Sequence, residues 1–117
     1  MDWKYLFTSF DGRINRGKFW AGVGVLIATA IVAQILDNVL GITIGESGLG
    51  PIYIIVGLIS LYCAISLYAK RWHDRDKSGW WTLIALVPFI GAIWLIVELG
   101  ILEGTKGSNQ YGTDPLA

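Results

Sequence analysis

The chain has 117 residues, of which 54% are hydrophobic and 15% are charged, and its nine lysines and arginines balance its nine aspartates and glutamates. A soluble domain usually carries about 25% charged residues, and the apolar residues here form long runs rather than an amphipathic period. This composition excludes a disordered chain, a collagen-like chain and a disulfide scaffold, and it argues against an ordinary soluble domain. No nucleic-acid partner is expected.

The first ten residues have the pattern of a short amphipathic helix. Trp3, Leu6, Phe7 and Phe10 recur at helical spacing, and polar side chains occupy the other face. A short helix of this kind lies in the membrane interface rather than across the bilayer. We therefore predict an interfacial helix over residues 2–10.

Three apolar stretches are long enough to cross a bilayer, whose hydrocarbon core of about 30 Å needs roughly 20 helical residues. They cover residues 19–36, 51–69 and 80–102. Within lipid every backbone N–H and C=O must be paired inside the segment, so we predict three transmembrane helices. These leave no room for a second domain. The expected fold is an all-α integral membrane protein, with one membrane domain over residues 1–117 and a tail over 103–117.

Local signals mark where these helices begin. Asn15 and Ser78 are suitable N-caps, and a proline in the first turn, as at Pro51, costs no hydrogen bond. Inside the third stretch, Pro88 removes a backbone donor and is expected to kink the helix. The alternative is a re-entrant hairpin that turns at Pro88–Gly91 and returns the tail to the cytoplasm.

A cleaved signal peptide is the competing interpretation of the first stretch, because residues 28–30 have the small-residue form of a cleavage site. The apolar run continues past them to Leu36, and the basic segment before it is long for a secretory leader. These features favour a membrane-spanning helix.

Lysine and arginine are concentrated on alternate connections. Four precede the first span, four lie in residues 70–79, one lies in the tail, and residues 37–50 contain none. The positive-inside rule then predicts a multi-pass plasma-membrane protein whose N-terminus and 70–79 loop are cytoplasmic. With three spans, the C-terminal tail would be periplasmic or extracellular.

Catalytic and metal sites find little support in the sequence. The single cysteine, Cys63, lies within the second span, and a zinc site at the single histidine, His73, would need about four ligands. Ser78 lies five residues from His73, but nothing fixes their geometry. We predict no catalytic residue, no metal and no cofactor, and the sequence leaves open whether the protein is an enzyme.

The predicted cytoplasmic side has a rim of basic residues that suggests a more specific function. Arg13, Arg16, Lys18, Arg71 and Arg75 lie near aromatic residues at headgroup level. Such a rim attracts anionic lipid, and guanidinium groups can also hold a phosphate or a partner's carboxylate. The leading hypothesis is a non-enzymatic protein that interacts with anionic lipid headgroups or with a larger membrane protein.

The same cations also have a structural interpretation. In it, Arg13 or Arg16 pairs with Asp74 or Asp76, so that the charges orient the chain and brace it instead of binding a ligand. Both interpretations place the basic residues on the cytoplasmic side.

Two other functions stay open. An oligomeric transporter or channel needs polar helix faces that converge on a path, and Gln34, Ser60 and Glu98 are the candidates. Small residues such as Gly24 permit close helix contact, within one chain or in a homo-oligomer. A membrane-embedded hydrolase or transferase would use the Arg-x-His-Asp loop at residues 71–74.

Four motifs in register give the chain a resemblance to a known family. They are Gly12-Arg13 with Arg16 and Phe19-Trp20, then Arg71-Trp72-His73-Asp74, then Ser78-Gly79-Trp80-Trp81 with Pro88 and Gly91, and finally a tail with Asn109, Tyr111-Gly112 and Asp114-Pro115. Over nearly the whole chain they resemble the bacterial inner-membrane family called domain of unknown function 805. Trp72 and Thr113 depart from it, since the family usually has leucine and often has proline there.

The resemblance implies a small bacterial inner-membrane protein and brings no activity to transfer. It also raises a tension, because a tail on the far side of the membrane could not touch the Arg-x-His-Asp loop. The family's polar signature supplies the hypothetical binding residues, which are Arg13, Arg16, Arg71, His73, Asp74, Asn109, Tyr111 and Asp114.

Overall fold

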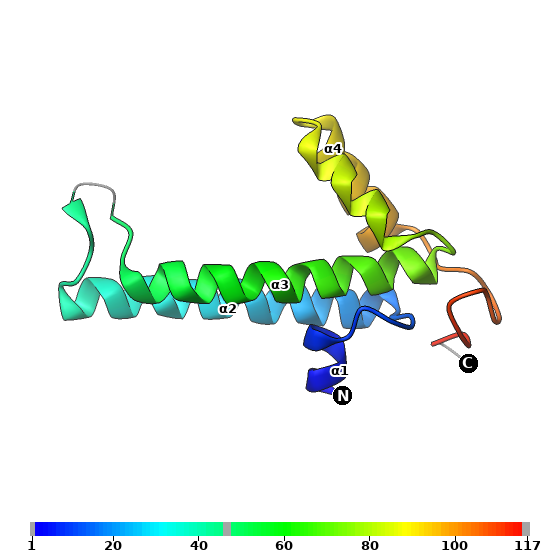
Figure 1. Ribbon diagram of the computed structural model, residues 1–117, viewed down its shortest axis with the longest axis horizontal. Helices are drawn as coiled ribbons and strands as arrows, with labels where there is room; N and C mark the ends of the chain where they lie inside the picture. Colours follow the sequence, from blue (N-terminus) through cyan, green and yellow to red (C-terminus); the bar gives the residue numbers. More distant parts are fainter. Residues whose placement is uncertain (1, 46–47, 116–117) are drawn as a thin grey trace.

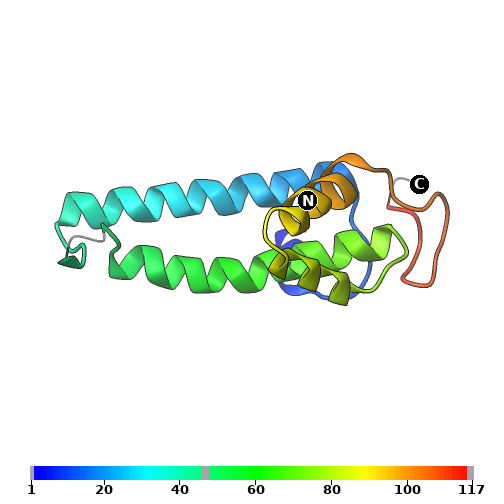
Figure 2. The same cartoon turned by 90° about the horizontal axis from the view of Figure 1, so that it is seen from above.

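The computed structural model describes residues 2–45 and 48–115, and within these ranges the only extended regular structure is helical. Two long antiparallel helices form a shaft, and the shorter helices and the tail gather at one end of it (Figures 1 and 2). We call this the polar end, where residues 9–16, 70–79 and 98–115 meet. The elements in chain order are α1 (Trp3–Thr8), α2 (Arg16–Leu40), α3 (Pro51–Asp74), the 3-10 helix η2 (Gly79–Leu86), α4 (Ile90–Leu95) and the π-helix η3 (Ile96–Ile101).

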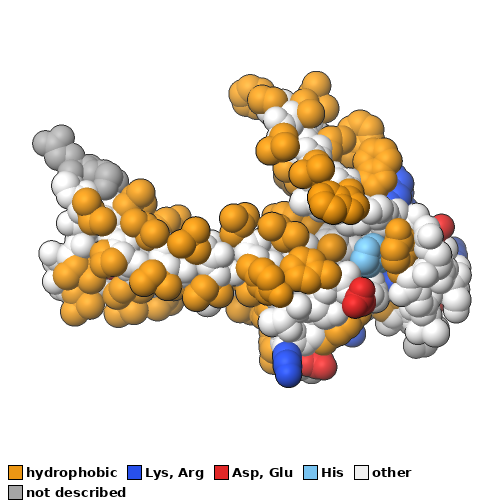
Figure 3. Space-filling model, viewed as in Figure 1, with side chains coloured by type: hydrophobic (Ala, Val, Ile, Leu, Met, Phe, Trp, Pro, Cys, Tyr) orange, Lys and Arg blue, Asp and Glu red, His pale blue; other side chains and the backbone are white. Residues whose placement is uncertain are grey.

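The shaft helices α2 and α3 are both long and apolar enough to cross a membrane. Side chains such as Ile31, Val39 and Leu58 are more than half exposed, and apolar side chains are spread along the visible face of the shaft in Figure 3. An apolar surface of this extent suits lipid, in which a helix keeps its backbone groups paired internally. The predicted spans 19–36 and 51–69 fall within α2 and α3.

The two shaft helices pack closely at Gly22. A Cβ atom at this position would lie 2.8 Å from both Cδ atoms of Leu67. A Cβ atom at Gly24 or Gly57 would meet nothing within 4 Å. The absence of a side chain at Gly22 therefore allows α2 to pack closely against Leu67 of α3. Gly24, which the sequence suggested for close contact, borders open space.

The predicted helix starts at Asn15, Pro51 and Ser78 are confirmed. The Asn15 side chain accepts a hydrogen bond from the backbone N–H of Lys18 at 2.8 Å, which caps α2. Pro51 occupies the first turn of α3, and the Ser78 hydroxyl accepts from the N–H of Trp80 at 3.3 Å. Local side-chain chemistry thus sets where each helix begins.

Buried Asp37 ties the far ends of α2 and α3 together. The residue before α3 is Gly50, which has no side chain to cap the helix, and the Asp37 carboxylate accepts from the N–H groups of Ile52 and Tyr53 at 3.2 and 2.8 Å instead. A Cβ atom on Gly50 would lie 2.2 Å from the Asp37 carboxyl carbon. A carboxylate at a helix N-terminus is favoured by the helix dipole.

Helix α1 lies across the polar end of the shaft rather than along it (Figure 1). It is shorter than the predicted 2–10, with Leu6 buried against the shaft and Trp3 exposed. Buried Lys70 of α3 donates to the carbonyl oxygens of Tyr5 and Leu6. A cation from α3 therefore satisfies the last turn of α1 and holds this helix in place.

The segment predicted as a third transmembrane helix, 80–102, folds into a helical hairpin instead. The chain runs out along η2, reverses at Val87–Phe89 and returns along α4 and η3 (Figure 1). Pro88 lacks the N–H that a continuous helix would need, and Phe89 turns the chain with a φ of +62°. The prediction of one kinked helix is wrong, and the backbone follows the alternative, a hairpin at Pro88–Gly91.

The hairpin brings the tail back to the polar end, where it lies beside the N-terminal segment (Figure 1). The expectation that the N-terminus and the tail lie on opposite faces of the membrane assumed a third crossing, and the contacts between Arg13 and the tail do not support it. The last two residues of the predicted tail, 116 and 117, lie outside the described ranges.

Candidate functional site

A buried ion cluster lies at the centre of the polar end. The carboxylate of Asp74 accepts from the Nε of Arg13 at 3.1 Å, and Arg71 binds its other oxygen. The side chains of Arg13, Arg71 and Asp74 are only 1%, 0% and 4% exposed. The structural interpretation of the basic residues is confirmed for Arg13, which pairs with Asp74. Because this cluster is closed to solvent, its charges pair within the protein and are not open to an external ligand.

Arg13 joins the tail to this cluster. Its Nη1 donates to the carbonyl oxygens of Gly107 and Gly112 at 2.7 and 3.1 Å, and its Nη2 donates to that of Thr105 at 2.6 Å. At the start of the tail, a Cβ atom on Gly104 would lie 1.9 Å from Oδ2 of Asp74. The tail therefore wraps directly over the ion cluster, with glycine where the chain comes closest.

The returning arm of the hairpin is held through its C-terminal carbonyl oxygens. The Arg71 side chain donates to the carbonyl oxygens of residues 99 and 102. Trp20 donates to the carbonyl oxygen of residue 100 at 2.9 Å, and Arg16 donates to that of residue 101 at 2.7 Å. Arg75 donates to the next carbonyl, that of residue 103. Cations at a helix C-terminus satisfy unpaired carbonyl groups and complement the helix dipole. These side chains therefore dock the hairpin onto α2 and α3.

Glu98 pairs with two cations at the base of the hairpin. Its carboxylate lies 3.0 Å from Nε of Arg75 and 2.8 Å from Nζ of Lys77. Burial raises the pKa of Glu98, but the hydrogen bonds and charges of Lys77 and Arg75 outweigh it, so that its pKa lies below the ordinary value. Glu98 is thus an ionised anchor at the polar end.

His73 is oriented by contacts on three sides. Its Nδ1 lies 2.9 Å from the carbonyl oxygen of Gly12, and its ring stacks on Tyr111 with centroids 4.0 Å apart. The side chain of Asn109 donates to the His73 carbonyl at 2.9 Å and accepts from the N–H of Tyr111. Because a carbonyl oxygen can only accept, Nδ1 carries the proton.

The structure brings most of the predicted polar signature together. Arg13, Arg71 and Asp74 form the ion cluster, whereas Asn109 and Tyr111 hold the tail against His73. Asp114 accepts from the N–H of Gly107 at 2.9 Å and so shapes the tail itself. Arg16 lies at the edge, where it binds the hairpin and forms a long, exposed ion pair with Glu103.

Sequence reasoning missed the roles of Lys70 and Trp20. Lys70 was counted only as a basic loop residue, although Ser66 and Lys70 are four residues apart and share one helix face, a spacing that could have marked the α1 docking site. Trp20 has the position of an interface anchor, but its indole N–H binds Gly100 of the hairpin.

The arrangements that the alternative functions need are not formed within the described part of the chain. Gln34 donates to the carbonyl of Gly48 at the far end of the shaft, whereas Glu98 lies at the polar end, so they do not line one path. His73 and Asp74 point to different partners, Gly12 and the two arginines. Residues 2–45 and 48–115 contain no group of three histidine, cysteine or acidic side chains that could hold a metal ion.

A family of known sequences matches the sequence of this chain. The family described as "Protein of unknown function (DUF805)" matches residues 7–113, which include the first three motifs and all of the fourth except Asp114-Pro115. The chain belongs to this family. Inner membrane protein YhaH of Escherichia coli K12 is 36% identical to this DUF805 protein over 98% of the chain and 97% of its own length.

Two further relatives support the assignment. Inner membrane protein YhaI of Escherichia coli K12 is 32% identical over 93% of this chain and 87% of its own length. Uncharacterized protein YiiR of the same strain is 28% identical over 95% of the chain and 88% of its own length. No solved structure shows significant similarity to the chain. The DUF805 protein is thus a homologue of inner membrane proteins over almost its full length.

Proposed function

We propose that this DUF805 protein is a non-enzymatic inner-membrane protein that binds anionic lipid headgroups around its polar end. The observation that carries the proposal is that some of its cations are buried and paired, whereas others form no ion pair. Arg13 and Arg71 are buried and fully engaged inside the protein, whereas Lys4 and Lys18 form no ion pair within the described residues. Lys4 follows Trp3 in the sequence and Lys18 lies two residues before Trp20, and both tryptophans are exposed. Basic residues beside such rings suit a headgroup layer.

The orientation of the chain follows from the same charges. Since the tail returns to the polar end, all nine lysines and arginines belong to this end, and residues 37–50 at the other end contain none. The positive-inside rule then favours a cytoplasmic polar end, with two spans and a hairpin that enters the membrane from the cytoplasmic side. In this arrangement α1 lies in the cytoplasmic interface.

A pair of C-terminal reporter fusions tests this orientation. We expect a green fluorescent protein fused after residue 117 to be fluorescent, and alkaline phosphatase fused at the same point to be inactive, because the first reporter works inside the cytoplasm and the second outside it. An alkaline phosphatase inserted in the 41–50 loop is the matched control and should be active. An active phosphatase at the C-terminus would contradict the proposed topology.

The lipid interaction is tested by neutralising the unpaired lysines. In nanodiscs containing anionic and zwitterionic lipid, we expect the double variant Lys4→Gln and Lys18→Gln to lose enrichment of anionic lipid around the protein, by about fivefold for each lysine at low salt. The enrichment of the unaltered protein should also fall as salt rises. Quantifying the lipids retained after native release from the disc measures the effect.

The matched control is Lys106→Gln, because this exposed lysine has no aromatic residue within two positions in the sequence, unlike Lys4 and Lys18. It removes one positive charge from the same end and is expected to change the enrichment less than either of the other lysines. Equal enrichment in the unaltered protein and the double variant would refute the headgroup proposal, without affecting the topology.

A further inference from the structure

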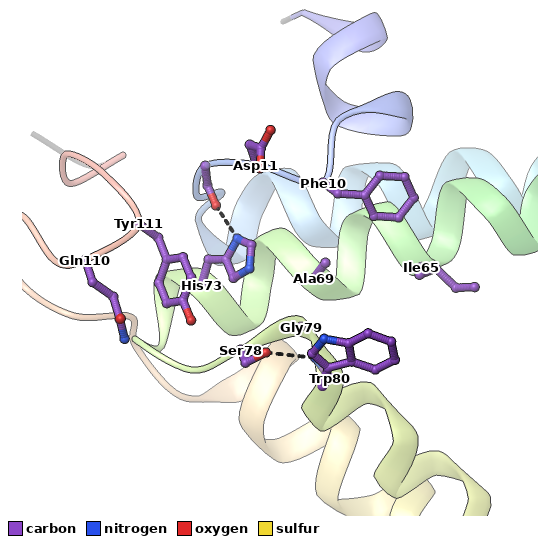
Figure 4. Close-up of a pocket in the computed structure, with 11 residues that line it drawn as sticks. Phe10, Asp11, Ile65, Ala69, His73, Ser78, Gly79, Trp80, Gln110 and Tyr111 are labelled. Carbon is purple, nitrogen blue, oxygen red and sulfur yellow. Dashed lines mark hydrogen bonds between the residues drawn. The ribbon is translucent and has the colours of Figure 1, made fainter.

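A cleft of about 680 Å³ opens beside His73, between four separate segments of the chain. Its floor is one face of α3, formed by Ile65, Ala69 and His73, which are four residues apart and therefore lie in a row. Residues 10–12 form one wall and residues 78–80 at the base of the hairpin form the other (Figure 4). A volume of this size falls in the range of small-molecule binding sites, roughly 300–1,000 Å³.

The two ends of the cleft differ in chemistry. Phe10, Ile65 and Trp80 form an apolar end in the direction of the shaft, and all three side chains are exposed. Around His73, the cleft is lined by the hydroxyl-bearing Ser78 and Tyr111 (Figure 4). A molecule that fills both ends must therefore have an apolar chain and a polar head.

The free nitrogen of His73 defines what the head must offer. Nδ1 donates to Gly12, so in the neutral imidazole Nε2 carries a lone pair, and it makes no hydrogen bond within the described ranges. A Cβ atom on Gly79 would lie 3.9 Å from Nε2, which places this nitrogen beside the hairpin wall of the cleft. This accessible acceptor can receive a hydrogen bond from a donor in the cleft.

The charge of the lining argues against an anionic head. Among the described residues that line the cleft, Asp11 is the one with a carboxylate, and neither lysine nor arginine takes part. Phosphate and carboxylate heads need such cations, whereas a neutral hydroxyl can donate to His73 and exchange hydrogen bonds with Ser78 and Tyr111.

From this geometry we infer that the cleft is a binding site for one amphiphile with an apolar chain and an uncharged head that bears hydroxyl groups. The chain lies along Ile65 between Phe10 and Trp80, and a head hydroxyl donates to Nε2 of His73. This site is separate from the unpaired lysines proposed to attract anionic lipid, and it selects for an uncharged head instead of an anionic one.

His73 itself can report binding. It is the single histidine in the chain, so its imidazole nitrogen signals need no assignment to a residue. The protein, labelled with nitrogen-15 histidine in phosphatidylcholine nanodiscs, is titrated with monolauroylglycerol. We expect a saturable movement of the Nε2 resonance as the hydroxyl donates to it. Methyl laurate has the same chain without a donor, and laurate has an anionic head, so neither should produce this movement.

Variants of α3 separate a specific cleft from general partition into the bilayer. Ile65→Trp fills the apolar end, and we expect it to weaken monolauroylglycerol binding about tenfold or more, since it displaces two or more buried methylenes. The control Ile55→Trp places the same ring elsewhere on α3; Ile55 is 58% exposed, against 42% for Ile65. It should stay within about twofold of the unaltered protein, because it leaves the buried contacts of the ligand unchanged.

A second variant tests the polar end without disturbing the fold. Tyr111→Phe keeps the ring that stacks on His73 but removes the hydroxyl, so it should weaken binding while leaving the ligand-free His73 spectrum unchanged. The inference would be overturned by no movement of Nε2 with monolauroylglycerol, by equal movement with methyl laurate, or by equal affinity in Ile65→Trp and Ile55→Trp.

Discussion

Replacing Asp74 by asparagine is expected to release the tail from the polar end and to lower the free energy of unfolding by about 3–5 kcal/mol, the usual cost of breaking a buried ion pair. Asparagine has nearly the shape of aspartate, so it fits beneath Gly104, where the chain passes closely over the carboxylate. It leaves Arg13 and Arg71 as two buried cations without a counter-charge. Their repulsion and desolvation cause the loss.

Two measurements check this prediction. Thermal or denaturant unfolding in micelles gives the change in stability, and the rate of trypsin cleavage after Lys106 measures how accessible the tail is. Because Arg13 binds the carbonyl groups of Thr105 and Gly107, it holds the chain on both sides of Lys106. We expect cleavage at Lys106 to become faster in the variant as these contacts are lost.

A second substitution shows whether charge is the cause. In the double variant Arg13→Met with Asp74→Asn, one of the stranded cations is gone, so the loss of stability should be smaller than the sum of the two single losses. Glu103→Gln is the control on a surface pair, because Glu103 is 61% exposed and lies 3.8 Å from Arg16. It should change stability by less than about 1 kcal/mol. A tail that stays protected in Asp74→Asn would contradict the role given to the cluster.

The shaft was predictable because its signals are local. An uninterrupted apolar run defines α2 and α3, and Asn15 and Pro51 act within one turn of the helix that each begins. Such signals lie within a few residues of the structure they specify. The amphipathic pattern of α1 is local in the same sense, although its buried contact with Lys70 is not.

The direction of the third apolar segment was not predictable from its composition. A kinked spanning helix and a hairpin contain the same apolar residues, and Pro88 is compatible with both. What separates them is the contact between Gly91 and the backbone of Ile84, which forms only when the two arms meet. The positive-inside rule, applied to three crossings, separated the tail from the N-terminal segment, whereas Arg13 binds the tail in the folded chain.

The charge rule also could not tell an orienting cation from a buried one. Arg13 and Lys18 look alike in the sequence, yet Arg13 pairs with Asp74, 61 residues away, and with tail carbonyls more than 90 residues away. These partners follow from the tertiary fold alone. The polar residues of the family resemblance include most of the residues of the site. The folded structure was needed to show that the ion cluster is buried and that Arg13 binds both Asp74 and the tail.

Gly91→Ala is expected to open the hairpin, at a cost to stability in the range of about 1–3 kcal/mol or more that overpacking a well-packed contact causes. The added Cβ atom would lie 1.9 Å from the carbonyl oxygen of Ile84 and 3.0 Å from Cα of Ala85. Both are backbone atoms, so no side chain can rotate away to make room. The arms must separate, and this draws the carbonyl groups of residues 99–103 away from the cations that bind them.

The matched control is Gly24→Ala, which makes the same chemical change in a helix where a Cβ atom would meet nothing within 4 Å. Alanine favours the helix over glycine, so this variant should be unchanged or more stable by up to about 1 kcal/mol. Unfolding in micelles compares the two variants, and trypsin cleavage after Lys106 shows whether opening the hairpin also frees the tail. If Gly91→Ala were as stable and as well protected as Gly24→Ala, the two arms could not be packed backbone to backbone, and the hairpin would no longer explain why the tail shares the polar end with the N-terminus.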